Sequence, residues 1–227
     1  MVLILAHRGA HQVARENTVE AFGDARRLGA DGVELDVRLS VDGAMVVHHD
    51  VDIAGLGPIS SLRVADLPAY VPLLEAAVEA CGDLVVNIEL KDLPGEPGYD
   101  PSYPLARMVA QFVTDGHLVD RVVVSSFDLR ALDAALEVEP ALATGWLTPS
   151  SFDQALALET VRQRGHRRLH PHYDGVTEDL VRAAHEAGIG VTAWTADDPA
   201  TVARLAAAGI DAIITNFVDV ARRTLAG

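Results

Sequence analysis

Short apolar runs alternate with longer amphipathic segments along the whole chain, and this alternation limits the possible folds more than any other property of the sequence. Apolar runs such as Arg121–Ser126 and Ala212–Thr215 contain mainly Val, Ile or Ala, which is typical of strands buried on both faces. Segments such as Asn17–Leu28 place apolar residues at helical spacing. Repeated strand–helix units of this kind predict a parallel sheet wrapped by helices.

We expect strands at Val2–Ala6, Gly32–Leu39, Val46–His49, Leu84–Leu90, Arg121–Ser126, Ala141–Trp146, Arg167–His170, Gly188–Trp194 and Ala212–Thr215. We expect helices at Asn17–Leu28, Pro72–Ala80, Leu105–Val113, Leu129–Val138, Phe152–Gln163, Glu178–Ala187, Ala200–Ala208 and Val218–Leu225. No low-complexity stretch or long linker divides the sequence, so we interpret residues 1–227 as one domain.

The predicted strands exceed by one the number that a (βα)8 TIM barrel needs, and the Asp42-Gly43 dipeptide indicates which one is extra. Asp-Gly between two strand-like runs favours a two-residue type I′ hairpin turn. Such a turn would place Asp36 opposite His49. We therefore predict that Ala44–His49 returns antiparallel beside the second barrel strand, which leaves eight parallel strands in an α/β barrel.

Composition excludes several classes of protein. Acidic residues number 33 against 18 basic ones, and a net charge of −15 makes a nucleic-acid binder unexpected. The single cysteine, Cys81, excludes a disulfide framework. Apolar runs such as Val2–Ala6 are far shorter than the roughly 18 residues of a membrane span. Met1–Ala6 lacks a basic start and a cleavage site, so we expect no signal peptide and a cytoplasmic protein.

Three acidic residues fall where neighbouring strands end, on the face that carries the active site in TIM barrels. Glu34 and Asp36 are two residues apart and share a strand face, and Glu89 holds a matching position on the next barrel strand. Three close carboxylates would raise one another's pKa unless a cation offset their charge. The sequence therefore predicts an oxygen-ligand metal site for Mg²⁺, Ca²⁺ or Mn²⁺, with solvated charges as the alternative.

His7 and His49 also end strands beside this acidic cluster. Imidazole titrates near neutral pH, so a pair of histidines can share the duties of general acid and general base. A structural histidine is the alternative for each. His48 should point to the opposite face of its strand, and we interpret it as structural.

Two cationic residues, Arg8 and Lys91, lie within reach of the same cluster, and Lys91 is the only lysine of the chain. A cation, a guanidinium and an ammonium together suit a phosphate group. A salt bridge to Glu16 is the alternative role for Arg8.

Taken in order, these residues resemble the signature of the glycerophosphodiester phosphodiesterase family, and the resemblance spans nearly the whole chain. The matching segments are Ala6-His7-Arg8-Gly9, Glu16-Asn17-Thr18, Glu34-Leu35-Asp36-Val37, Val46-Val47-His48-His49-Asp50, Ile88-Glu89-Leu90-Lys91, Ser125-Ser126-Phe127, Ala193-Trp194-Thr195 and Gly209-Ile210-Asp211 through Thr215. The family fold is a (βα)8 barrel related to phosphatidylinositol-specific phospholipase C.

The resemblance implies hydrolysis of small glycerophosphodiesters to an alcohol and sn-glycerol 3-phosphate with a divalent cation. It implies the following roles: metal ligands Glu34, Asp36 and Glu89; catalytic histidines His7 and His49; substrate-binding residues Arg8, Lys91 and Trp194. A buried core tryptophan is the alternative for Trp194. The alternative functions are a lysophospholipase-D-type phosphodiesterase and a non-catalytic phosphate-binding barrel.

The sequence departs from the family pattern in three places. Arg15 stands where proline is usual, and Thr215-Asn216-Phe217 stands where Asp and Pro are common. The segment Val51–Val71 is much shorter than the usual insertion, which predicts a more open site. The head group, the attacking oxygen (water or the glycerol 2-hydroxyl), the oligomeric state and the roles of His170 and His172 stay open.

Overall fold

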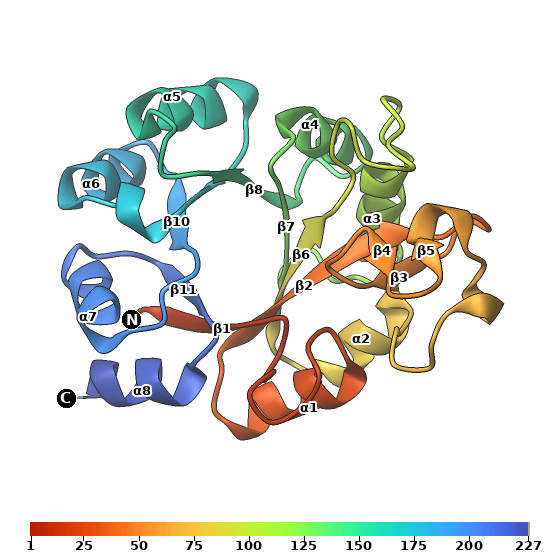
Figure 1. Cartoon of the computed structure of the whole chain (residues 1–227). Helices are drawn as coiled ribbons and strands as arrows, with labels where there is room; N and C mark the ends of the chain where they lie inside the picture. The colour runs from red at the N-terminus through yellow and green to blue at the C-terminus, as the bar shows by residue number, and fades with distance from the viewer. Residues whose placement is uncertain (227) are drawn as a thin grey trace.

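The computed structural model describes residues 1–226, and its central element is a closed barrel of parallel strands (Figure 1). Within that range, eight strands pair in parallel in the order β1, β11, β10, β9, β8, β7, β6 and β2, and β2 pairs with β1 to close the barrel. These strands are β1 (Leu3–His7), β2 (Gly32–Leu39), β6 (Val85–Leu90), β7 (Val122–Ser126), β8 (Ala143–Thr148), β9 (Arg168–Pro171), β10 (Gly190–Ala193) and β11 (Ala212–Thr215). The predicted (βα)8 TIM barrel is confirmed.

The helices of the described chain surround the barrel, and each one follows a barrel strand in the sequence, in one case after a longer connecting segment (Figure 1). They are α1 (Val19–Arg27), α2 (Leu74–Ala80), α3 (Pro104–Asp115), α4 (Leu129–Val138), α5 (Gln154–Arg164), α6 (Glu178–Glu186), α7 (Pro199–Ala207) and α8 (Val218–Ala226). Helix α1 begins where Thr18 Oγ1 accepts a hydrogen bond from Ala21 N at 3.2 Å. Among residues 1–226, no helix is long and apolar enough to cross a membrane.

The predicted antiparallel return is confirmed as β3 (Met45–Val47), but its predicted register is wrong by one residue. The connecting loop has three residues, because Ser40 N donates to Ala44 O at 3.0 Å. A type I′ turn needs positive φ at both central residues, whereas only Gly43 of the Asp42-Gly43 pair takes one, at +80°. The glycine therefore closes a three-residue loop and not a two-residue turn.

The changed register places His48, and not His49, opposite Asp36: His48 N donates to Asp36 O at 2.9 Å. Because β3 ends at Val47, His49 lies beyond the paired strand and is free of the strict alternation of its side chains. His49 still faces the cavity at the end of the barrel, although it does not pair with Asp36 as the two-residue turn predicted.

The segment after His49 is more structured than the sequence indicated. It contains a short hairpin, β4 (Asp52–Ile53) with β5 (Gly57–Pro58), and two 3₁₀ turns, Ile59–Ser61 and Val64–Asp66. Ile53 and Ile59 pack on Val46 of β3 in a small core of their own. This segment lies against the β3 side of the barrel (Figure 1).

Two buried histidines lie away from the strand ends that carry the predicted site. His170 on β9 is fully buried, and burial lowers its pKa to about 3. His166 is also buried beside Thr144, with its Nδ1 2.9 Å from Thr144 Oγ1, and burial lowers its pKa to about 4. Both rings are therefore neutral in the folded protein at pH values where the unfolded chain already takes up protons.

Acid should destabilise the fold through these two histidines. Between about pH 6.5 and about pH 5 the unfolded chain binds more protons than the folded one, so the free energy of unfolding falls by up to about 1.4 kcal/mol per pH unit for each ring. Urea unfolding at several pH values checks this. The His170→Leu variant should show a shallower slope than the wild type and the exposed control His117→Asn; equal slopes in all three proteins would contradict the prediction.

Candidate active site

A cavity of about 220 Å³ opens at the carboxyl ends of the barrel strands. Its walls are His7, Arg8, Glu34, His49, Asn87, Glu89, Lys91, Phe127, Leu147, Trp194, Thr195 and Ile214. The structure thus brings seven of the eight predicted site residues to one cavity. The eighth, Asp36, lies beside it, in contact with Arg8 and Lys91.

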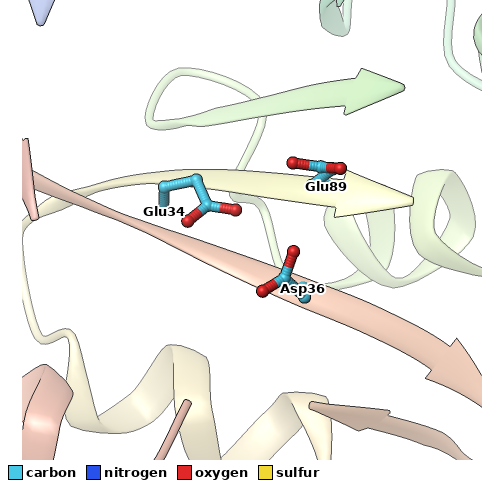
Figure 2. A group of neighbouring side chains, drawn as sticks. All are labelled: Glu34, Asp36 and Glu89. Atoms are coloured by element: carbon cyan, nitrogen blue, oxygen red, sulfur yellow. The ribbon is translucent and has the colours of Figure 1, made fainter. Parts of the chain in front are cut away.

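The three predicted carboxylates converge, as Figure 2 shows. One oxygen from each of Glu34, Asp36 and Glu89 lies within 4.8 Å of the others. The pairing of β2 with β6 causes this, because Asp36 is in register with Glu89 and Glu34 with Asn87. All three acidic residues are buried.

Burial and mutual repulsion make this cluster costly in charged form. Burial raises the pKa of Glu34 well above its ordinary value, and the neighbouring Asp36 and Glu89 raise it further. Burial likewise raises the pKa of Glu89 to about 7, although Lys91 opposes this. Burial also disfavours ionised Asp36, but Lys91 and Arg8 outweigh it and lower the pKa of that carboxyl.

The donor set fits a hard divalent cation. Within the described part of the chain, Glu34 Oε1 and Asp36 Oδ1 are buried and accept no hydrogen bond. Lys91 Nζ lies 3.1 Å from Asp36 Oδ1, but not in line for a hydrogen bond. Oxygen ligands of this kind suit Mg²⁺, Ca²⁺ or Mn²⁺. The three carboxylates and the two cations, Arg8 and Lys91, leave one negative charge, which a divalent cation and a phosphodiester monoanion would together bring to zero.

Both cationic side chains contact these carboxylates. Lys91 Nζ donates to Glu89 Oε1 at 2.5 Å. Arg8 Nε lies 3.3 Å from Asp36 Oδ2, and its Nη1 donates to Glu16 Oε1 at 3.1 Å. The alternative role considered for Arg8, a salt bridge to Glu16, therefore coexists with its place in the cavity wall. The backbone N of Arg8 also donates to Glu34 Oε2 at 3.0 Å.

The two predicted histidines each have one ring nitrogen fixed by a neighbour. His7 Nδ1 lies 2.7 Å from Asn216 Oδ1, which only accepts, so His7 donates there and its Nε2 is left without the proton. Burial lowers the pKa of His7 to about 4, which keeps the ring neutral. His49 Nδ1 lies 2.8 Å from the Asp50 carboxylate and donates to it.

Several residues that support the site had no assigned role in the sequence. Asn17 Nδ2 donates to Asp36 Oδ2 at 2.8 Å, and Asn216 Nδ2 donates to Asp197 Oδ2 at 2.7 Å, which orients the Asn216 amide toward His7. Asn17 belongs to the Glu16-Asn17-Thr18 segment that matches the family signature, so the sequence could have indicated its role. Asn216 stands where the sequence departs from the family pattern, and this departure could have indicated its role. Nothing in the sequence indicated Asp197.

The remaining predicted residues take clear positions. Trp194 lines the cavity and also donates from Nε1 to His170 O at 2.7 Å, so it has features of both a pocket wall and a core residue. His170 lies inside the barrel, whereas His172 packs on Trp194 with ring centroids 5.2 Å apart. His48 is half-buried and is not part of the cavity wall, as expected for a structural residue.

Comparison with known proteins shows the relatives of this chain. The model of the glycerophosphoryl diester phosphodiesterase family matches residues 7–220. A glycerophosphodiester phosphodiesterase of Caldanaerobacter subterraneus subsp. tengcongensis is 30% identical over 94% of this chain and 93% of its own length. The crystal structure of the Thermotoga maritima glycerophosphodiester phosphodiesterase is 29% identical, with a TM-score of 0.83 over 98% of both chains. An Oleispira antarctica phosphodiesterase, solved in complex with the product sn-glycerol-3-phosphate, shares the fold at 24% identity (TM-score 0.87, 99% of this chain and 97% of that one).

Divalent cations should stabilise the protein through the carboxylate cluster. A cation at a hundredfold excess over its dissociation constant raises the free energy of unfolding by about 2.7 kcal/mol. We expect Mg²⁺, Ca²⁺ or Mn²⁺ to raise the melting temperature of the wild type but not of Glu34→Gln.

Without a cation, Glu34→Gln should be at least as stable as the wild type, because it removes a buried charge. The exposed control Glu137→Gln should keep the full cation effect. A full effect in Glu34→Gln would contradict the assignment of this cluster.

Proposed function

The chain belongs to the glycerophosphoryl diester phosphodiesterase family, and from this premise we propose that it hydrolyses small glycerophosphodiesters to an alcohol and sn-glycerol 3-phosphate with the help of a divalent cation. The observation that carries the proposal is that three carboxylates, two histidines and two cations meet at one cavity. The complex of the Oleispira antarctica neighbour with sn-glycerol-3-phosphate supports the identity of the product.

Glu34, Asp36 and Glu89 would hold the cation, which when bound offsets the negative charge that develops on the phosphate oxygens. Mg²⁺, Ca²⁺ and Mn²⁺ all suit this all-oxygen donor set.

Arg8 and Lys91 bind and orient the phosphate in this proposal. Both already lie within 3.3 Å of the Asp36 carboxylate, so each can turn from a carboxylate oxygen to a phosphate oxygen with little movement. The guanidinium of Arg8 offers a planar pair of donors, and the ammonium of Lys91 offers a compact charge.

His7 and His49 carry out the proton transfers. Each ring has its Nδ1 fixed, His7 by Asn216 and His49 by Asp50, which leaves the Nε2 of each ring for the reaction. One histidine, with its Nε2 unprotonated, removes the proton from the attacking oxygen, and the other, in its imidazolium form, gives its own Nε2 proton to the leaving alkoxide. The attacking oxygen belongs to water or to the glycerol 2-hydroxyl, and release of a cyclic phosphate would identify the second.

The apolar part of the cavity fits the glycerol carbon atoms. Phe127, Leu147, Trp194 and Ile214 form this wall, and the Phe127 and Trp194 rings meet edge to face at 5.5 Å. A volume of about 220 Å³ accommodates a glycerol phosphate with a small head group. Glycerophosphodiesters are therefore the substrates that we propose, with lysophospholipids as the alternative.

Removal of either proposed catalytic histidine should abolish most activity without unfolding the protein. General acid–base catalysis contributes about 10² to 10⁴ in rate, so His7→Ala and His49→Ala should lose at least about a hundredfold in kcat. The neighbouring variant His48→Ala is the matched control and should keep near-normal turnover. Turnover close to that of the wild type in either His7→Ala or His49→Ala would remove the assignment.

Substrate choice separates the proposed function from its alternatives. With a divalent cation present, glycerophosphocholine should release choline and sn-glycerol 3-phosphate faster than lysophosphatidylcholine is cleaved, and EDTA should stop both reactions. Faster cleavage of the lysophospholipid would favour the lysophospholipase-D-type activity. Cation binding without turnover of either substrate would favour a phosphate-binding barrel.

A further inference from the structure

A buried arginine, Arg38, lies next to the candidate active site, and the proposed mechanism gives it no part. Arg38 follows Glu34 and Asp36 at two-residue spacing on β2, so the alternation that directs those carboxylates inward also directs Arg38 to the same face. Its side chain is only 9% exposed, which is unusual for an arginine. A buried guanidinium must have hydrogen-bond partners that compensate for the loss of water.

The guanidinium of Arg38 donates to the backbone of two proposed active-site residues. Nε and Nη2 both donate to the carbonyl oxygen of His49, at 3.0 and 2.8 Å. Nη1 donates to the carbonyl oxygen of Lys91 at 2.9 Å and to Glu96 Oε2 at 2.8 Å. One planar group thus joins β2, the segment that carries His49 and the segment that carries Lys91.

Both carbonyl groups lie just past the end of a strand. β3 ends at Val47 and β6 ends at Leu90, so the carbonyl groups of His49 and Lys91 lie beyond the regular β-ladder, although Lys91 N still donates to Val37 O at 3.0 Å. The hydrogen bonds of the ladder therefore do not fix these two peptides in full. The guanidinium of Arg38 donates hydrogen bonds to both carbonyl groups beyond the end of the ladder. Arg38 belongs to the strand that also carries Glu34 and Asp36.

We propose that Arg38 is a positioning residue: its guanidinium holds the peptides of His49 and Lys91 in fixed register with the carboxylates of β2. The role rests on the proposed function of those two residues, and Arg38 itself does not touch the substrate. Glu96 completes the arrangement, because its carboxylate offsets the buried charge and accepts from the same Nη1 that binds Lys91.

Lysine cannot take the place of arginine in this role. The fork of a guanidinium presents donors in fixed directions, whereas an ammonium is a single point on a flexible stem and cannot span both carbonyl groups. A misplacement of about 1 Å in an active site can cost about a hundredfold in rate. We expect Arg38→Ala and Arg38→Lys to lose between about 10- and 100-fold in kcat while still unfolding cooperatively.

Added guanidinium provides a direct test of the geometry. A small cavity of about 30 Å³, lined by Lys91, Asp92 and Glu96 among others, adjoins Arg38, so the space left in Arg38→Ala can admit a guanidinium ion. Millimolar guanidinium should restore part of the activity of Arg38→Ala and should not activate the wild type. The matched control Arg107→Ala, which removes an exposed arginine paired with Glu137, should neither lose activity nor respond.

A double-mutant cycle separates positioning from general stability. If Arg38 acts through His49 and Lys91, Arg38→Lys should cost less in the His49→Ala background than in the wild type, because one of the two groups that it positions is already gone, and the cost that remains should come through Lys91. A cycle with Lys91→Met should show partial coupling of the same kind. Loss that is fully additive in both backgrounds would overturn the proposal and leave Arg38 a general contributor to the fold.

Hydrogen–deuterium exchange gives a readout that does not need activity. The amides of His48 and Lys91 should exchange faster in Arg38→Ala than in the wild type, and guanidinium should slow them again. If Arg38→Ala does not fold, Arg38→Lys and Glu96→Gln serve for the same measurement. Unchanged exchange would overturn the positioning role of Arg38. An inactive wild type or an active His49→Ala would instead overturn the proposed function. In that case the exchange measurement alone would decide whether Arg38 fixes the two peptides.

Discussion

Three buried carboxylates within 4.8 Å of one another are the interaction on which the rest of this site depends. Their mutual repulsion and their burial oppose ionisation, so positive charge must be brought to them. Lys91 and Arg8 supply part of it, and Asn17 donates a further hydrogen bond to Asp36. A divalent cation would supply the remaining positive charge. The charge of the bound cation and the charge of a bound diester would then partly offset each other.

The barrel geometry turns a pattern of two-residue spacing into this cluster. On β2 the alternation of side chains directs Glu34, Asp36 and Arg38 to one face, and the parallel register with β6 brings Glu89 beside Asp36. A shift of β2 by one residue would reverse Glu34, Asp36 and Arg38, and a shift of β6 by one residue would reverse Glu89. The same constraint explains why the carbonyl groups of His49 and Lys91, just past the ends of their strands, need a separate anchor.

Local sequence patterns predicted the strands, the helices and the barrel, because each depends on spacing within a few residues. They also placed the candidate site residues at strand ends, where the structure brings them together, while their catalytic roles stay predictions. The hairpin register was wrong because Asp42-Gly43 also suits a three-residue loop, and the choice depends on the hydrogen bond between Ser40 and Ala44. The contacts of Asn216 with His7 and of Arg38 with Lys91 join residues far apart in sequence, for which no local pattern exists.

A crystal structure with Mn²⁺ and sn-glycerol 3-phosphate, in which anomalous scattering locates the metal, tests the proposed site most directly. We expect one Mn²⁺ bound by Glu34, Asp36 and Glu89, and a phosphate in contact with it that lies between His7 and His49. A metal bound elsewhere, or a phosphate outside this cavity, would rule out the proposed site.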